Sequence, residues 1–382
     1  MLPSLRIAAP VVTRVTPKLD PIMPAVTEFH DPIGYKPPLD MGVSVDPALV
    51  NRYSGALTPE SQFSSRIERE TKWDVDVGDL AAFRDKLETM AGDPKLVQEL
   101  LGKGWTMTRV QKYFARDPNG TILRDREGKP VLEPMKDTYF DVPGLPIISR
   151  EAALRFRELE GDTLNAVNVK PGPGITVDPG ITTRVEYGLT VQPGVKQHPE
   201  RMAEFFGSDE HLNPFRHIRE LVPTLDPHEL QPAVHISDLR NKYNLVHDDG
   251  TEVEVSLDNF KGTSPFAPGK NSHRGQLEME VNHMQLTSDN VLGAAPPAAA
   301  AGGGLDDLAA LLAQMGGSAT LGGAPRIHQP SDIFNPLLRE DGAYHQQEAI
   351  TRALGDYLYE GRTPEVAKQK AYVIAKDLGL VE

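Results

Sequence analysis

Residues 67–73 read Ile67-Glu68-Arg69-Glu70-Thr71-Lys72-Trp73, and the spacing of charges at every second position in this stretch recurs in the segments that decide the fold. Glu68, Glu70 and Lys72 occupy every second position. Because successive side chains of a β-strand point to opposite faces of a sheet, these three charges share one face. The stretch therefore predicts a strand with one charged face. On a single half-buried strand, a charged face ordinarily points to solvent.

The same period of two recurs in the region from residue 65 to residue 286. Eight segments with this alternation are predicted strands, namely 66–75, 136–141, 153–159, 166–170, 182–191, 234–246, 252–260 and 275–285. Eight such strands indicate a closed antiparallel sheet. Four amphipathic segments predict helices that pack outside this sheet, namely 77–90, 94–101, 199–206 and 214–225.

Charges recur on one face of several of these strands. The further pairs at alternate positions are Arg155 with Arg157, Arg184 with Glu186, Arg240 with Lys242, and Glu278 with Glu280. The opposite face is apolar, as at Leu154 and Leu277. If helices cover that apolar face, the charges point inward and line a wet tunnel. Confined charges need compensation, because unpaired desolvated ions are costly, and a bound polyanion with metal ions would provide it.

Composition divides the chain into four parts. Residues 1–64 are rich in proline and are predicted to form an extended or loosely docked arm, and residues 65–286 hold the tunnel domain. Residues 287–330 form an Ala/Gly/Pro-rich linker with a short predicted helix at 305–315. Residues 331–382 form a helical tail, with predicted helices at 346–355 and 363–378, that docks on the main domain or on a partner. The expected fold class is α+β.

Two segments inside the tunnel domain carry turn residues. Residues 109–133 contain Asp117-Pro118-Asn119-Gly120, which is typical of an inserted hairpin. Residues 171–180 are rich in proline and glycine and are predicted to form a loop rather than a mobile flap.

The charge and composition exclude several classes of protein. Forty Lys and Arg against 54 Asp and Glu give a net charge of −14, which argues against a protein that coats nucleic acid or an anionic membrane. The absence of cysteine excludes disulfides, thiolate zinc sites and cysteine nucleophiles. The first 24 residues lack the apolar segment of a secretory signal, and no run of 18 apolar residues predicts a membrane span. We expect a cytoplasmic protein.

In their order along the chain, these motifs resemble those of the CYTH, or triphosphate tunnel metalloenzyme, superfamily. The matching motifs are Glu68-x-Glu70-x-Lys72, Tyr139-x-Asp141, Leu154-Arg155-x-Arg157, Val169-Lys170, Arg184-x-Glu186, Arg240-x-Lys242, Leu257-Asp258 and Glu278-x-Glu280. The resemblance covers about residues 66–285. The sequence departs from the family's pattern in a long segment at 74–136 and in Gly188, where many members carry a second acid.

The resemblance implies an eight-stranded triphosphate tunnel and a role for each charged position. It implies that triphosphate is bound by Lys72, Arg155, Arg157, Lys170, Arg184, Arg240 and Lys242. It implies a Mg²⁺ or Mn²⁺ site with ligands from Glu68, Glu70, Glu186, Glu278 and Glu280. Lys72, Glu70 and Asp258 are the expected catalytic positions, with Lys72 favoured as a phosphate contact over a proton-transfer group. Tyr139 and Asp141 are expected to be architectural.

Three functions remain open from the sequence. The first is metal-dependent hydrolysis of a small triphosphate, with inorganic triphosphate favoured over thiamine triphosphate and nucleotides because a narrow tunnel needs no base pocket. The second is a class IV type of adenylate cyclase that makes cyclic AMP from ATP. The third is a sensor or scaffold that binds triphosphate or polyphosphate without turning it over. A tunnel of this kind is too confined for duplex nucleic acid, and the tail could bind a protein partner.

Overall fold

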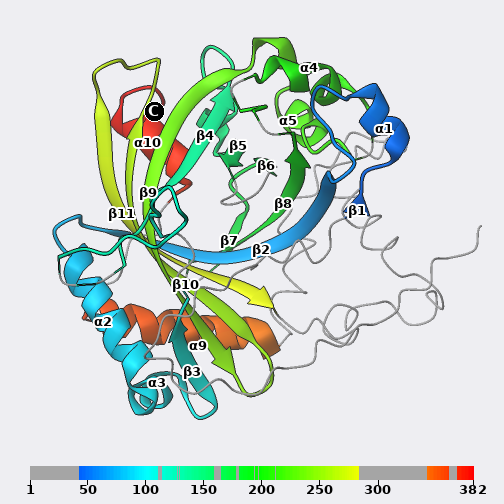
Figure 1. Ribbon diagram of the computed structural model, residues 1–382. Helices are drawn as coiled ribbons and strands as arrows, with labels where there is room; N and C mark the ends of the chain where they lie inside the picture. The colour runs from blue at the N-terminus through cyan, green and yellow to red at the C-terminus, as the bar shows by residue number, and fades with distance from the viewer. Residues whose placement is uncertain are drawn as a thin grey trace, which may run out of the picture. The chain divides into compact units, whose positions relative to one another are not determined.

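The computed structural model describes residues 43–110, 114–126, 128, 130–158, 165–177, 180–192, 194–196, 198–210, 212–283, 342–360 and 368–382 (Figure 1). Residues 1–42 of the predicted arm, the linker at 287–330 and its helix at 305–315 lie outside the described residues. The predicted start of the last helix, at 363, also lies outside them.

The described chain has mixed α and β structure around one large antiparallel sheet. Its strands are β1 (Val43–Ser44), β2 (Gln62–Val75), β3 (Trp105–Arg109), β4 (Met135–Asp141), β5 (Ala153–Glu158), β6 (Asn165–Lys170), β7 (Ile175–Val177), β8 (Ile181–Val191), β9 (Gln231–His247), β10 (Glu252–Thr263) and β11 (Asn271–His283). Each of the eight predicted segments coincides with one strand. The predicted number of strands is wrong, however, because the sheet has 11.

The strands follow the order β1-β2-β11-β10-β9-β4-β5-β6-β8-β7, with β3 paired to β9. Strand β2 has two long neighbours, since Phe63 to Glu70 pair with β8 and Glu70 to Val75 pair with β11. The register sets Glu68 opposite Arg184 and Lys72 opposite Glu278. Directly opposite side chains lie about 4.5–5.5 Å apart at Cβ, so this register places opposite charges in contact.

The three strands that the sequence did not predict are short. β7 lies in the segment predicted to be a loop and pairs with β8. Gly174 precedes it at φ 79°, where a Cβ would lie 2.8 Å from the carbonyl oxygen of Thr183. β3 lies in the long segment at 74–136, together with helices α2 (Leu80–Gly92) and α3 (Pro94–Leu101). A three-residue strand and an added edge strand give too little periodicity to be recognised.

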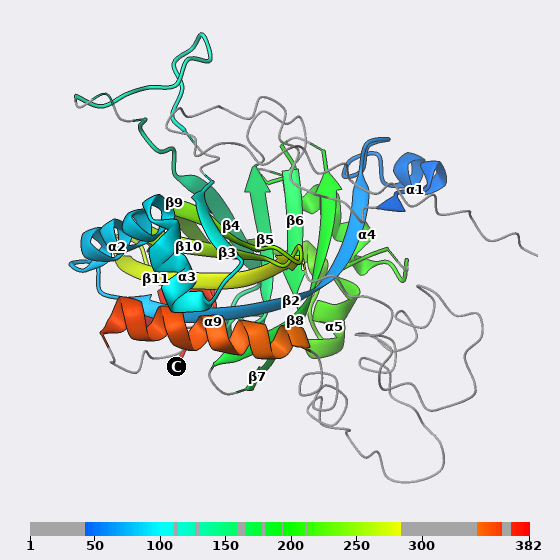
Figure 2. The same cartoon turned by 90° about the horizontal axis from the view of Figure 1, so that it is seen from below.

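Helices cover the apolar face of the sheet on two sides. On one side lie α2, α3 and α9 (Gly342–Tyr359), and on the other α1 (Pro47–Arg52), α4 (Glu200–Gly207) and α5 (Arg216–Leu221) (Figures 1 and 2). Phe83 and Leu354 pack with Trp73 of β2 in the first core, and Phe206 packs with Phe156 of β5 in the second. Burial of each large apolar side chain stabilises the fold by about 1.5–3 kcal/mol.

Local sequence explains where some of these helices begin. Asp93 caps α3 by accepting hydrogen bonds from the N–H groups of Lys95 and Leu96, and Pro94 occupies its first turn. Both features are favoured at a helix N-terminus, where the first N–H groups have no partner within the helix.

The last helix, α10 (Lys370–Asp377), belongs to a third core. Ile374 packs against Gly262 of β10, where an added Cβ would lie 2.4 Å from Ile374 Cγ2. Phe260 and Ile236 complete this contact from the neighbouring strands β10 and β9. Helix α10 therefore packs against the face of the sheet that carries the charges.

Among the described residues, no helix has the length and apolar character needed to span a membrane. The expectation of a cytoplasmic protein stays a prediction.

Candidate functional site

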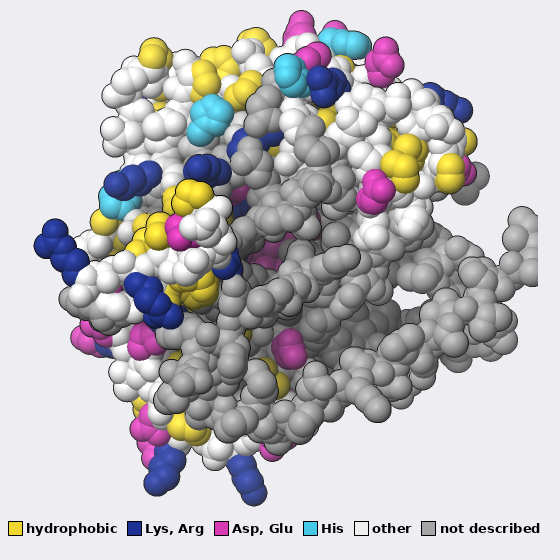
Figure 3. All heavy atoms as spheres, viewed as in Figure 1, with side chains coloured by type: hydrophobic (Ala, Val, Ile, Leu, Met, Phe, Trp, Pro, Cys, Tyr) yellow, Lys and Arg dark blue, Asp and Glu magenta, His cyan; other side chains and the backbone are white. Residues whose placement is uncertain are grey.

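The charged face of the sheet is buried. Nine of the predicted site residues are less than 9% exposed, namely Glu68, Glu70, Lys72, Lys170, Arg184, Glu186, Asp258, Glu278 and Glu280. The remaining four are partly buried, with side chains 13–18% exposed, namely Arg155, Arg157, Arg240 and Lys242. A solvated outer face would leave these side chains exposed, so that interpretation of the pattern is excluded. Figure 3 shows acidic side chains in a recess near the centre of one face.

Glu68 lies where two cations converge. Its carboxylate accepts hydrogen bonds from Lys170 Nζ, 2.7 Å from each oxygen, and from Arg184 Nε at 2.8 Å. Glu70, two residues along β2, pairs with Lys72 and with Arg184. Arg184 therefore connects both glutamates of the Glu68-x-Glu70-x-Lys72 motif.

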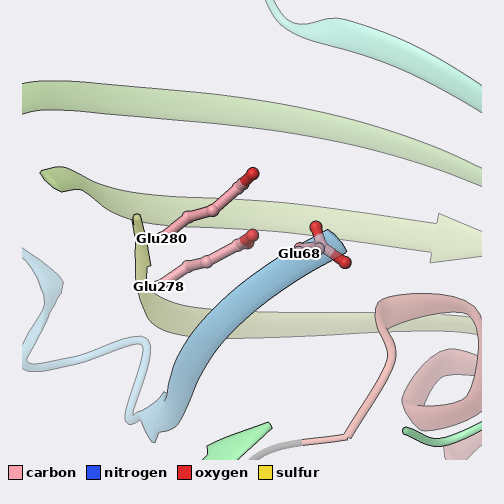
Figure 4. A group of neighbouring side chains, drawn as sticks. All are labelled: Glu68, Glu278 and Glu280. Carbon is pink, nitrogen blue, oxygen red and sulfur yellow. The ribbon is translucent and has the colours of Figure 1, made fainter. Parts of the chain in front are cut away.

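Three glutamates form a group that could hold a metal ion. One carboxylate oxygen each of Glu68, Glu278 and Glu280 lies within 4.8 Å of the others. Glu278 and Glu280 extend side by side from β11 toward Glu68 on β2 (Figure 4). Carboxylate oxygens are hard donors of the kind that Mg²⁺ and Mn²⁺ bind, so the donor set fits either ion.

Two of the five predicted metal ligands lie outside this group of three glutamates. Glu70 is engaged by Lys72 and Arg184. Glu186 lies 3.9 Å from Lys170 Nζ and 3.7 Å from Arg155 Nη2. At Gly188, two residues after Glu186, a Cβ would lie 2.5 Å from Ser64 Oγ.

Asp258 holds Arg240 through two parallel hydrogen bonds. Arg240 Nε lies 2.7 Å from Asp258 Oδ1, and Nη2 lies 2.8 Å from Oδ2. The same Nη2 lies 3.0 Å from Glu278 Oε2. Burial opposes the charge on Arg240, but attraction by Asp258 and Glu278 outweighs it and raises the pKa of Arg240. Lys242 pairs with Glu254 of β10.

The two arginines of β5 gather around Asp137 of β4. Arg157 donates from Nε and Nη2 to its two oxygens, at 2.7 Å each, and Arg155 Nη1 lies 3.7 Å away. Arg155 also donates to Asn168 Oδ1 at 3.0 Å. Burial opposes the charge on Asp137, yet attraction by Arg157 and Arg155 outweighs it and lowers the pKa of Asp137.

The two buried lysines differ in their electrostatic surroundings. Burial lowers the pKa of Lys72, and the attraction of Glu278 offsets only part of that effect. For Lys170, burial acts in the same direction, but Glu186 and Glu68 outweigh it and raise the pKa. Lys170 is therefore a fixed positive charge, whereas Lys72 is the lysine of this pair that gives up a proton more readily.

Four site residues were not predicted as such from the sequence. Asp238 and Glu254 share the periodicity of Arg240 and Asp258 on their strands, and Asp137 precedes Tyr139 in the same way, so the period of two could have identified them. Lys370 of α10 binds Asp238 and Asp258, and no local pattern in the tail indicates this role.

The buried charges nearly balance. Among the described residues, nine buried carboxylates belong to the site, namely Glu68, Glu70, Asp137, Glu186, Asp238, Glu254, Asp258, Glu278 and Glu280. A tenth, Asp141, accepts hydrogen bonds from backbone N–H groups of Val142, Ile147 and Ile148 instead. The cations are eight, namely Lys72, Arg155, Arg157, Lys170, Arg184, Arg240, Lys242 and Lys370. Each cation has a carboxylate within 4.0 Å, so an added anion must exchange with carboxylates of the chain itself.

Comparison with known proteins gives distant structural similarities. No family model and no curated protein matches the sequence. A candidate adenylate cyclase of Bacillus halodurans is similar with 15% identity and a TM-score of 0.32, over 60% of this chain and 89% of its own. A candidate adenylyl cyclase of Hippeastrum, described as having a dominant triphosphatase activity, is similar with 13% identity and a TM-score of 0.29, over 56% and 80%.

The S. pombe RNA triphosphatase Pct1 is similar with 8% identity and a TM-score of 0.22, over 57% of this chain and 70% of its own. These proteins are of the kinds that the motif resemblance names, cyclases and triphosphatases. All three TM-scores lie below 0.5.

Proposed function

We propose that this protein hydrolyses a small triphosphate, with Mg²⁺ or Mn²⁺, inside a tunnel lined by the charged face of the sheet. One observation carries the proposal: a group of three glutamates that suits a divalent ion lies among eight buried or partly buried cations that suit phosphate oxygens. A metal ion alone would be bound by the carboxylates and not by the cations. An anion alone would be bound by the cations and not by the carboxylates. A metal-bound polyphosphate uses both.

The pairing of β2 with β8 supports a tunnel. Strand pairings lead from β2 through β11, β10, β9, β4, β5, β6 and β8, and the last of these pairs with β2 again. The eight strands joined in this way are the eight that the sequence predicts. We propose that they form the wall of the tunnel, and that β1, β3 and β7 are additions to it.

The residues divide into groups by the chemistry they can perform. Glu68, Glu278 and Glu280 would hold the metal ion, with Glu70 and Glu186 beside them. The bound ion would neutralise phosphate charge and orient the phosphate chain. The cations Arg155, Arg157, Lys170, Arg184, Arg240 and Lys242 would bind phosphate oxygens and stabilise the charge of the transition state.

The catalytic positions of the proposal are Lys72, Glu70 and Asp258. Lys72 contacts Glu70, and with its lowered pKa it can either bind a phosphate oxygen or transfer a proton. We favour the phosphate contact. Asp258 orients Arg240 through its two hydrogen bonds.

The experiment that tests this function measures phosphate and pyrophosphate release from inorganic triphosphate, ATP and thiamine triphosphate, with Mg²⁺, Mn²⁺ or EDTA. Phosphate release that requires metal and is lost in Glu68→Ala/Glu70→Ala supports a triphosphatase. Glu99→Gln, an exposed position on α3, is the matched control and should keep full activity. Pyrophosphate with cyclic AMP from ATP indicates a cyclase, and tight triphosphate binding without turnover indicates a sensor or scaffold.

A further inference from the structure

The C-terminal helix contributes a charged group to the site. Lys370, the first residue of α10, is 9% exposed. Its ammonium lies 2.6 Å from Asp238 Oδ2 and 2.5 Å from Asp258 Oδ2. Lys370 is thus hydrogen-bonded to the same carboxylate that holds Arg240.

The packing of α10 fixes the position of this lysine. Ile374 packs against Gly262, and Asp377 at the end of the helix pairs with Arg274 of β11. Beside Lys370, the buried amide of Gln369 faces the guanidinium of Arg184. Lys370 therefore approaches the site from a helix with apolar contacts and an ion pair of its own.

Asp238 and Asp258 would oppose each other without this lysine. They lie on the paired strands β9 and β10 and are 1% and 0% exposed. Burial and the nearby charge of Asp258 both raise the pKa of Asp238. Among the described residues, Oδ1 of Asp238 has no hydrogen-bond partner, so the contact of Oδ2 with Lys370 is the hydrogen bond that stabilises its charge.

Arg240 is the next cation along the same face. Its guanidinium is attracted by Asp258, Glu278 and, more weakly, Asp238. If Lys370 did not neutralise Asp238, that carboxylate would compete with Asp258 and Glu278 for the same guanidinium. Arg240 would then turn away from Glu278 and from a phosphate bound beside it.

We propose that Lys370 is a positioning residue of the site, which neutralises Asp238 so that Asp258 keeps Arg240 oriented toward Glu278 and the phosphate chain. This inference rests on the proposed function, because it assigns Arg240 to a phosphate. With this role for Lys370, helix α10 contributes to the site itself, rather than only binding a protein partner.

The test compares full-length variants by calorimetric titration with inorganic triphosphate in the presence of Mg²⁺, by thermal unfolding, and by KM and kcat. Lys370→Met should weaken triphosphate binding at least tenfold and raise KM by a similar factor, with a smaller change in kcat. Lys370→Arg should restore binding to within about threefold. The matched control is Lys376→Met, an exposed lysine of the same helix, which should bind like the native protein.

The double variant Asp238→Asn/Lys370→Met separates positioning from a structural role. It removes the competing carboxylate together with its partner, so binding should return to within about threefold of native. A loss of binding in both variants, together with the same fall in melting temperature, would show that Lys370 only holds the helix in place and would overturn the inference. Unchanged binding in Lys370→Met would also overturn it. If the native protein itself binds no triphosphate, the proposed function fails first, and this inference fails with it.

Discussion

Lys170 contacts both carboxylate oxygens of Glu68, with Lys170 Nζ 2.7 Å from each of them. Glu68 is also one of the three glutamates that could hold a metal ion. One carboxylate cannot donate its lone pairs fully to both partners. A metal ion bound to Glu68 should release Lys170 to bind phosphate, and a phosphate bound to Lys170 should release Glu68 to bind the metal ion. The two binding events should therefore favour each other.

Lys170→Met tests this exchange. Removal of the competing ammonium should tighten Mn²⁺ binding in the absence of triphosphate by about tenfold, or about 1.4 kcal/mol. The same variant should bind triphosphate more weakly. Titration calorimetry with Mn²⁺ alone, then with triphosphate, measures both, and Lys376→Met is the control. Mn²⁺ binding that is unchanged or weaker in Lys170→Met would contradict the exchange.

Metal-side and phosphate-side substitutions should affect different kinetic constants. Glu278→Ala should lower kcat by about a hundredfold or more, because charge stabilisation by the metal ion is lost. Glu70→Ala should lower kcat as well, because Lys72 and Arg184 beside the metal site lose the carboxylate that they share. Arg157→Ala should chiefly raise KM. Steady-state kinetics at saturating metal separates the two effects. An equal loss of substrate affinity in all three variants, with turnover at saturation intact, would rule out this division of roles.

The pairing of Asp137 with Arg157 makes stability depend on pH. The folded-state pKa of Asp137 is lowered, so its contribution to the free energy of unfolding is present above about pH 4 and is lost as the pH falls through that lower folded-state pKa. Asp137→Asn takes the carboxylate away from the partly buried Arg157, which should cost about 3 kcal/mol at pH 7. Urea unfolding at pH 7, 5 and 3 should show the difference from native shrinking at low pH. A difference that stays constant, or grows as the pH falls, would count against the assignment.

Gly262 sets how closely α10 approaches the sheet. Gly262→Ala places a Cβ 2.4 Å from Ile374 Cγ2 and should destabilise the protein by about 1–3 kcal/mol. Ile374→Val in the same chain should recover part of that loss. Gly355→Ala is the matched control, because no atom lies within 4 Å of a Cβ there and alanine favours the interior of α9. Denaturant unfolding that gives both glycine variants equal stability would contradict this packing.

The sequence pattern was sufficient to identify the eight long strands and the buried charges on them. Residues such as Arg155 and Glu278 could be found because a strand repeats every two residues, so a local pattern determines which side chains share a face. Burial itself could not be read from that pattern, since a solvated face has the same alternation.

Other features depend on contacts between distant parts of the chain. Lys370 lies in an ordinary amphipathic helix, and its partners Asp238 and Asp258 are more than 100 residues away. The grouping of Glu68 with Glu278 and Glu280, but not Glu70, follows from the register of β2 against β11 and β8, which periodicity leaves undetermined.

The near balance of the buried charges has a consequence for association rates. Because each cation of the site has a carboxylate within 4.0 Å, little positive potential extends from the site into solvent, while the whole chain carries a net charge of −14. An approaching polyanion is therefore repelled until it reaches the site. Added salt screens this repulsion over about 10 Å, so at moderate ionic strength a triphosphate should associate faster, whereas a protein with an open basic groove would bind it more slowly.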